Sequence, residues 1–377
     1  MSFPRVALFL CQYQAPYAGS FIPALRALEE KLKGRGTRCI WVFPEDAGER
    51  PWCAALEDGG HRIEFLPGGS LRQLRRMNDL IRGERVDLIH AHFGYFTLAS
   101  LLALLHRRLR VLEHVHSDFS AGEKPSVKRR LVRVARRFIQ SRRVGRIMVG
   151  AHMLPHEKNA AYVPNGVDFS RMEDSRLSRE EMRNSLGVGD GQTLVLLFGW
   201  SPYIKGVDIA ARAMAHLQGE AFVLGVVCGR EVPGEEMKLW LQERTLPIDS
   251  IRFLPPVENV FDYHRAADVM LSASRSETFS YAVAEALYAC VPCVLSDIPG
   301  TRWAAAYETA RVFPSGDDAA LAEALQKAAA GYPADAYQRS RERVIKDCAL
   351  ERWVDGVITV YGLSQEPLSG DLLGSID

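Results

Sequence analysis

Short apolar runs alternate along the whole chain with longer segments in which apolar residues recur every three or four positions. The recurring pattern predicts amphipathic helices, the clearest of which cover 20–33, 71–82, 205–217, 279–290 and 350–361. The short runs predict β-strands at 6–11, 39–43, 62–66, 86–90, 111–115, 146–149, 193–198, 222–228, 251–254, 269–272 and 293–296. Apolar strands separated by helices are typical of parallel sheets covered on both faces, so the pattern predicts an α/β protein.

The alternation pauses near Asp168 and then starts again, which indicates two domains. A chain of 377 residues is also longer than most single domains. Ser178 and Glu181 have the spacing of a capping box that starts the first helix of the second half. We therefore predict two Rossmann-like, doubly wound domains that face each other across a cleft. They would comprise 1–168 with a returning C-terminal helix at 346–362, and 169–345, followed by a flexible tail at 363–377.

The formal charge divides the chain at the same place. The whole chain carries +1, but residues 1–170 contain 27 lysines and arginines against 16 acids, whereas the remainder contains 20 against 30. The two halves are thus a basic and an acidic body, and we expect them to have different partners.

The composition is that of a globular protein with reduced thiols. Hydrophobic residues make up 47% of the chain and charged residues 25%. The seven cysteines are odd in number and lie mostly within apolar runs, which favours buried thiols over a disulfide framework. Cys290 and Cys293 form a C-x-x-C without a second pair, so we expect no zinc site there.

Neither a signal peptide nor a membrane span is expected. The apolar run near the N-terminus is short and lacks a small-residue cleavage site. The longest apolar stretch, 88–105, contains His90, His92 and Gly94, and fits a buried strand followed by a helix better than a membrane span. The sequence therefore predicts a cytoplasmic protein.

The segment 274–288 carries the most informative chemistry. Glu277 follows a predicted strand, and Glu285 lies eight residues further on, about 12 Å away along a helix. Carboxylates suit the recognition of hydroxyl groups because each accepts two or more hydrogen bonds. Between them, the start of the predicted helix offers phosphate oxygens three amides, those of Thr278, Phe279 and Ser280. The spacing fits a sugar joined through a diphosphate to a ribose, although two solvated helix glutamates would show the same pattern.

These residues resemble the signature of a known family. Glu277-x7-Glu285, followed by Val291-Pro292 and Asp297-x-x-Gly300, is similar to the donor site of the retaining GT-B glycosyltransferases of family 4, group 1. Other segments resemble motifs of that family in order: the strand ends of its acceptor domain (86–92 and 115–118), its interdomain linker (162–168) and its glycine-rich strand end with a phosphate-binding lysine (198–208). The resemblance covers most of 5–362. It implies the GT-B fold and retaining transfer from a nucleotide diphosphate sugar, most often a UDP-sugar.

The resemblance also implies roles for single residues. Glu277 would contact the hydroxyls of the transferred sugar and Glu285 the ribose. Lys205 would neutralise the leaving diphosphate, which needs a fixed cation or a metal. His116 would line the sugar pocket, and Gly19 would let the loop after the first strand approach the phosphates. The donor's own phosphate would assist the incoming hydroxyl, so the implied hexosyltransferase needs no protein nucleophile, metal or other cofactor. Its acceptor would be a glycan, a glycolipid or a small molecule of surface polysaccharide or glycolipid synthesis.

Two positions depart from the family pattern. Trp200 stands where the family usually has an arginine, five residues before Lys205, so one diphosphate cation is missing. We expect Arg275 or Arg230 to substitute for it. Cys290 stands where a glycine usually precedes Val-Pro, so that helix end cannot be an ordinary glycine cap.

Two other functions remain open. His90 with His92, and His114 with His116, form H-x-H pairs at the ends of consecutive predicted strands, where alternate residues share a face and can ligate a metal. A metal-dependent hydrolase would use such pairs, although no acidic companion motif follows. The missing cation at Trp200 would instead suit a non-catalytic sugar-nucleotide-binding protein. A dinucleotide oxidoreductase is not expected, because no G-x-G-x-x-G follows a predicted strand.

A basic segment, 124–146, holds ten lysines and arginines and no acid. Its apolar residues recur at helical spacing, which predicts an amphipathic helix. The cationic face would be solvated, would contact anionic membrane lipid at the inner membrane face, or would serve a soluble anionic acceptor. A nucleic-acid partner is not expected, because no aromatic residues interleave with the charges.

Overall fold

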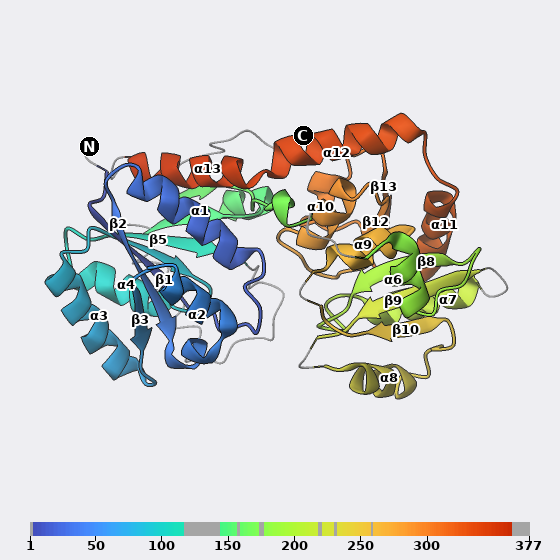
Figure 1. The fold of residues 1–377 in the computed structure, drawn as a ribbon, viewed down its shortest axis with the longest axis horizontal. Coiled ribbons are helices and arrows are strands. Elements are labelled where there is room, and N and C mark those ends of the chain that lie inside the picture. The colour runs from blue at the N-terminus through green and yellow to red at the C-terminus, as the bar shows by residue number, and fades with distance from the viewer. Residues whose placement is uncertain are drawn as a thin grey trace. The chain divides into compact units, whose positions relative to one another are not determined.

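The computed structural model describes residues 3–116, 144–156, 159–172, 177–217, 221–229, 232–257 and 259–363 (Figure 1). The chain divides between Gly166 and Val167, and again between Ala349 and Leu350, into two compact units. The first unit therefore takes its last helix from the far end of the sequence.

A parallel sheet of seven strands forms the centre of the first unit, in the order β3-β2-β1-β4-β5-β6-β7. Its strands are β1 (Val6–Cys11), β2 (Arg38–Pro44), β3 (Ile63–Leu66), β4 (Leu88–His92), β5 (Arg110–Val115), β6 (Gly145–Met148) and β7 (Ala160–Tyr162). Every residue of β1 is buried, as expected for a central strand covered on both faces. Phe9 of β1 lies between Trp41 of β2 and His90 of β4.

Helices bury apolar side chains against both faces of this sheet. One face is covered by α1 (Phe21–Lys33), α2 (Pro51–Asp58) and α13 (Leu350–Gly362). The other is covered by α3 (Ser70–Glu84) and α4 (Phe96–Leu105). α13 packs along α1, so the predicted return of the C-terminal helix to the first domain is confirmed (Figure 1).

The second unit repeats the design with a six-stranded parallel sheet in the order β10-β9-β8-β11-β12-β13. Its strands are β8 (Thr193–Phe198), β9 (Phe222–Val227), β10 (Ile251–Leu254), β11 (Val269–Ser272), β12 (Cys293–Ser296) and β13 (Ala310–Phe313). One face packs on α7 (Val207–His216), α8 (Gly234–Gln242) and α11 (Asp318–Ala329). The other packs on α6 (Arg179–Ser185), α9 (Phe261–Ala266), α10 (Tyr281–Tyr288) and α12 (Ala334–Cys348). The predicted pair of doubly wound Rossmann-like sheets is confirmed.

Local expectations are confirmed for the capping box and for the cysteines. Ser178 accepts a hydrogen bond from the amide of Glu181 at 3.2 Å, and the Glu181 side chain accepts one from the amide of Ser178 at 2.8 Å, which is the predicted capping box. All seven cysteines are free, and all but Cys290 are buried. Within the described residues, no helix is long and apolar enough to cross a membrane.

Cys290 shows how the helix α10 ends without a glycine. Its backbone is left-handed, with φ at 59°. The amide of Cys290 donates to Leu287 at 3.2 Å and that of Val291 donates to Ala286 at 2.9 Å, which are the two hydrogen bonds of a Schellman cap. The usual cap geometry is thus kept with a cysteine in the glycine position, at a backbone cost of roughly 1 kcal/mol.

Candidate functional site

The strand order of the second sheet marks the place where a ligand is expected. Chain order reverses between β8 and β11, which are neighbours in the sheet. Ligands of open parallel sheets bind beyond the carboxyl ends of the strands at such a switch point. Lys205 follows β8 and Glu277 follows β11, so the fold brings these two predicted residues to the same edge.

Lys205 and Glu277 form a shielded ion pair. Lys205 Nζ contacts Glu277 Oε1, and the side chains are only 14% and 12% exposed. Ser274 Oγ donates a hydrogen bond to the same carboxylate oxygen at 3.0 Å. A charge held away from water needs a partner, and each of these groups supplies one for the other. The site therefore holds a cation suited to binding phosphate and, in contact with it, a carboxylate suited to accepting hydrogen bonds from hydroxyl groups.

Two glycines let the loops of this site approach one another. A Cβ at Gly206 would lie 2.0 Å from the carbonyl oxygen of Ala273, and one at Gly300 would lie 1.9 Å from that of Glu277. Gly206 also has a positive φ of 67°. The loops after β8, β11 and β12 are therefore locked together by backbone contacts that admit no side chain. This fixes the backbone of Glu277.

Arg275 contacts the loop after β8 and the start of α7. Its guanidinium donates to both carboxylate oxygens of Asp208 at 2.7 Å, and to the carbonyl oxygen of Tyr203 at 2.6 Å. Burial alone would raise the pKa of Asp208, but the hydrogen bonds and charges of Arg275 and Arg212 together outweigh burial and hold that pKa below its ordinary value. Arg275 is therefore a bidentate brace between the loop after β11 and the start of α7.

The position of the missing arginine is occupied by an exposed aromatic ring. Trp200 is 55% exposed, and Lys205 Nζ lies 5.1 Å from the ring centroid. This is within the range of a cation–π contact. Trp200 therefore helps to position Lys205 but does not supply a second cation. Arg230, the other expected substitute, lies outside the described residues.

Glu285 lies on α10 and faces a histidine that the sequence analysis did not single out. Nε2 of His264 is 3.5 Å from Oε2 of Glu285. His264 is fully buried, and its ring nitrogens have no close hydrogen-bond partner among the described residues. No local pattern marks His264, because only the packing of α9 on α10 brings it to the carboxylate.

The helix after Glu277 begins later than predicted. α10 starts at Tyr281 with Ser280 as its N-cap, so Thr278 and Phe279 lie in the preceding loop. The expectation that all three amides stand at the helix start is therefore wrong for Thr278 and Phe279. The ring of Phe279 is buried and stacks on Trp303 with centroids 4.9 Å apart. The estimate of 12 Å between the two glutamates assumed a continuous helix and does not apply.

The remaining predicted residues, Gly19 and His116, lie in the first unit, whose own switch point falls between β1 and β4. Gly19 lies between β1 and α1 with φ at 56°, a conformation that glycine adopts without strain. His116 follows β5 and is half-buried. Gly19 and His116 thus occupy the edge of the first sheet at which a ligand is expected.

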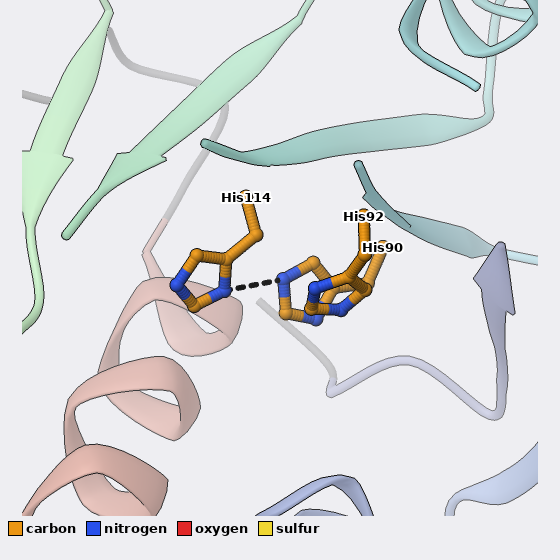
Figure 2. Close-up of side chains that lie close together, drawn as sticks. All are labelled: His90, His92 and His114. Carbon is orange, nitrogen blue, oxygen red and sulfur yellow. Dashed lines mark hydrogen bonds between the residues drawn. The ribbon is translucent and has the colours of Figure 1, made fainter. Parts of the chain in front are cut away.

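His116 is one of four stacked histidines, three of which Figure 2 shows. Nε2 of His90 and Nδ1 of His114 are 3.2 Å apart, and Nδ1 of His92 and Nε2 of His116 are 2.9 Å apart. Tyr361 of α13 hydrogen-bonds Nδ1 of His90 at 2.8 Å. Burial lowers the pKa of His90 and of His116 to about 3 and lowers those of His92 and His114 well below their ordinary value. All four rings are therefore neutral at pH 7.

His90, His92 and His114 are also close enough to be considered as metal ligands. One nitrogen from each lies within 4.8 Å of the others. The group has no anionic member, and the side chains are fully buried in the core under α13. The contacts of His90 with His114 and of His92 with His116 already engage one ring nitrogen of each of these side chains. The histidines are better explained as hydrogen-bonded pairs.

Comparison with known proteins gives matches in both units. Residues 192–330 match the family model described as glycosyl transferases group 1, and residues 24–171 match the one described as glycosyltransferase family 4. The two matches together take in most of the chain.

Curated relatives are similar over parts of the chain. A D-inositol 3-phosphate glycosyltransferase of Xylanimonas cellulosilytica is 32% identical over 37% of this chain and 35% of its own length. One of Geodermatophilus obscurus is 23% identical over 75% of this chain and 68% of its own. An alpha-monoglucosyldiacylglycerol synthase of Streptococcus pneumoniae is 29% identical over 36% of this chain and 32% of its own.

Solved structures share the fold over nearly the whole chain. HepE of Anabaena in complex with UDP has a TM-score of 0.75 at 17% identity, covering 95% of this chain and all of HepE. Sucrose-phosphate synthase of Thermosynechococcus elongatus has a TM-score of 0.75 at 19% identity, covering 95% and 98%. At such low identity these similarities establish the fold alone.

Proposed function

The chain belongs to the family 4, group 1 glycosyltransferases, which have the GT-B fold, and from this we propose that it transfers a sugar from a UDP-sugar to an acceptor hydroxyl with retention of configuration. The observation that carries the proposal is the Lys205–Glu277 pair at the switch point of the second sheet. It offers one group for a diphosphate and one for sugar hydroxyls. Family membership removes the hydrolase alternative.

Donor binding would exchange the partners of this ion pair. Lys205 leaves Glu277 for the diphosphate, and the freed carboxylate accepts hydrogen bonds from the sugar hydroxyls. Glu285 accepts hydrogen bonds from the ribose, and amides at the start of α10 bind phosphate oxygens. We keep Arg230 as the candidate second cation, since Arg275 is engaged by Asp208.

The reaction then needs no protein nucleophile. The bond from the anomeric carbon to the diphosphate breaks and a bond to the acceptor oxygen forms on the same face of the sugar. The acceptor proton passes to the departing phosphate oxygen. Lys205 stabilises the negative charge that grows on the diphosphate, which takes the role that a metal plays elsewhere. His116 and Gly19 of the first unit serve the sugar and the phosphates.

Similar proteins support a choice of donor and acceptor. HepE was solved with UDP and with UDP-glucose, which favours a UDP-sugar here. The relatives' names point to an inositol phosphate or a glycolipid as the acceptor class. The second unit would bind the donor, and the basic first unit would bind an acceptor that carries phosphate or lies in a membrane.

Contact with an anionic membrane is part of this proposal. Most of the basic segment 124–146 lies outside the described residues, and its sequence alone supports the idea. Wild-type protein should sediment with anionic vesicles at low salt and less so as salt rises. Replacing Arg129, Arg133, Arg136 and Arg137 by Gln should abolish this. If wild-type protein ignores anionic vesicles at low salt, the membrane contact is wrong.

A thermal-shift screen of nucleotides and nucleotide sugars tests donor binding. A native-state ligand at about 100 times its dissociation constant stabilises by about 2.7 kcal/mol. We expect UDP and at least one UDP-sugar to raise the midpoint, and Lys205→Ala to reduce the shift more than Lys327→Ala, an exposed control lysine. No shift with any nucleotide diphosphate would contradict the proposed donor class.

A further inference from the structure

His116 is held in place by residues at the carboxyl ends of two neighbouring strands. Nδ1 of His92, the last residue of β4, lies 2.9 Å from Nε2 of His116. The ring of Phe93 stacks on that of His116, with centroids 4.7 Å apart and planes 23° apart. The ring of His114 stacks on it as well, at 4.5 Å and 9°. The contact with His92 and the rings packed on His116 therefore fix its orientation.

Phe93 adopts an unusual backbone conformation to make its contact. Its φ is 64°, in the left-handed region that bulky residues rarely occupy. Such a conformation costs about 1–3 kcal/mol and persists only where the surroundings impose it. This conformation brings the ring of Phe93 against the ring of His116. Strained residues of this kind are concentrated at functional sites, and this one lies at the end of β4.

The proton positions follow from burial and from the pattern of partners. His92 is fully buried, and its Nε2 has no hydrogen-bond partner among the described residues. Burial lowers the pKa of both histidines far below 7, so each ring is neutral and carries one proton. A proton on Nε2 of His92 would be an unpaired buried N–H, which folded proteins rarely contain. The proton of His92 is therefore on Nδ1, where it meets an acceptor.

We propose that Nδ1–H of His92 donates to Nε2 of His116 and so holds His116 as the Nδ1–H tautomer, a hydrogen-bond donor to a sugar oxygen and not a base. The role toward the sugar rests on the proposed function, in which His116 lines the sugar pocket. His92 is a positioning residue, because it acts through His116. This agrees with a reaction in which the donor phosphate, not a side chain, receives the acceptor proton.

Two variants of His92 separate hydrogen bonding from packing. His92→Asn keeps an N–H close to the position of Nδ1, whereas His92→Leu removes it. In wild-type protein labelled with ¹⁵N-histidine, two-bond correlations at pH 7.5 should show His116 protonated at Nδ1, with His116→Gln identifying its signals. The Asn variant should keep this tautomer, and the Leu variant should show a mixture.

Kinetics provide the second readout. Misplacing a group at the reacting centre costs on the order of 100-fold, so His92→Leu should lower kcat by about 10- to 100-fold. UDP affinity should stay unchanged, and His92→Asn should restore most of kcat. If His92 had a structural role alone, His92→Leu would change thermal stability without this selective loss of kcat and its recovery in His92→Asn.

Each outcome bears on one claim. A wild-type His116 protonated at Nε2 overturns the proposal, whatever the activity. An unchanged kcat in a folded His92→Leu overturns the positioning role. If His92→Leu does not fold, the wild-type spectrum and the kcat of His92→Asn still decide, since the Asn variant must retain both tautomer and turnover. If the tautomer is as expected but wild-type protein turns over no nucleotide sugar, the proposed function fails and the tautomer assignment stands.

Discussion

Glu277 and Lys205 neutralise each other in the candidate donor site. Each side chain is largely shielded from water, and either charge alone would be costly there. Ser274 orients the carboxylate, and Trp200 lies beside the ammonium group. A donor that carries both hydroxyls and a diphosphate can satisfy the two groups at once. A free sugar or a free phosphate would satisfy only one of them and leave the other without its partner.

Replacing Glu277 should separate nucleotide binding from transfer. Glu277→Gln removes the charge that accepts hydrogen bonds from the sugar, so we expect turnover of a UDP-sugar to fall by at least about 100-fold. The change also frees Lys205, so UDP should bind at least as tightly as to wild-type protein. Calorimetric titration of UDP and a UDP-release assay measure the two effects. Glu323→Gln, at an exposed glutamate paired with Lys327, is the matched control. Parallel loss of UDP affinity and turnover would count against the role of Glu277.

Replacing Lys205 should act mainly on the transition state. The diphosphate gains negative charge as it leaves, so a fixed cation stabilises the transition state more than the bound donor. Lys205→Ala should therefore lower kcat by about 100- to 1000-fold and weaken donor binding by a smaller factor. Steady-state kinetics with a donor titration distinguish these effects. A variant with normal kcat and weak donor binding would refute the leaving-group role.

At the scale of elements, the site depends on loops that meet backbone to backbone. The loops after β8, β11 and β12 approach at Gly206 and Gly300, where a side chain has no room. Ser296 Oγ adds a hydrogen bond to the carbonyl oxygen of Ser274 at 2.6 Å. The position of Glu277 therefore depends on the loops that follow three strands, β8, β11 and β12.

Gly300→Ala tests this arrangement. The new Cβ would lie 1.9 Å from the carbonyl oxygen of Glu277 and 2.9 Å from its Cβ, so the loop must move. We expect the free energy of unfolding to fall by about 1–3 kcal/mol and turnover to fall even where the protein remains folded. Gly189→Ala is the control, because the nearest atom to its Cβ would be Gln192 Oε1, at an ordinary 3.5 Å. Wild-type stability and turnover in Gly300→Ala would disprove the loop contact.

The helices and strands that the sequence predicted are those with a strong apolar pattern. β7 was missed because it has only three residues, and β13 because it is an edge strand in which only Phe313 is buried. The start of α10 was placed too early because Phe279 continues the apolar spacing, whereas its ring packs on Trp303 and its backbone stays in the loop. Apolar periodicity cannot distinguish a helical residue from a loop residue with a buried ring, since the side chain is buried in both.

Site residues were predictable only where a motif marked them. The glutamates and Lys205 stand at spacings that resemble a family signature, and the fold brings Glu277 and Lys205 together. The contacts of Arg275 with Asp208 and of Glu285 with His264 join elements far apart in sequence. Such pairs depend on how helices and loops pack, so no local pattern reveals them.

At the scale of the whole molecule, the buried histidines tie stability to pH. Native His90 binds a proton only near pH 3, whereas an unfolded histidine does so near 6.5. Between these values the unfolded chain binds more protons, so the free energy of unfolding falls as pH falls. The expected slope is about 1.4 kcal/mol per pH unit for each such histidine.

Urea unfolding at pH 7.5 and at pH 5.5 measures this linkage, because most carboxylates stay ionised at both values. We expect a lower midpoint at pH 5.5, and a smaller difference between the two midpoints in His90→Phe. Equal stability of the wild-type protein at the two pH values would show that the histidines are not buried as neutral groups.

The proposed transfer is the central claim, so its most direct test is turnover by the whole chain. The measurement is UDP release from a panel of UDP-sugars, with inositol phosphates and glycolipids as acceptors, followed by ¹H NMR of the anomeric proton of the product. We predict release that depends on an acceptor, an α-linked product from an α-linked donor, and no loss of rate in EDTA. Binding of UDP without turnover of any donor, or a β-linked product, would contradict the account.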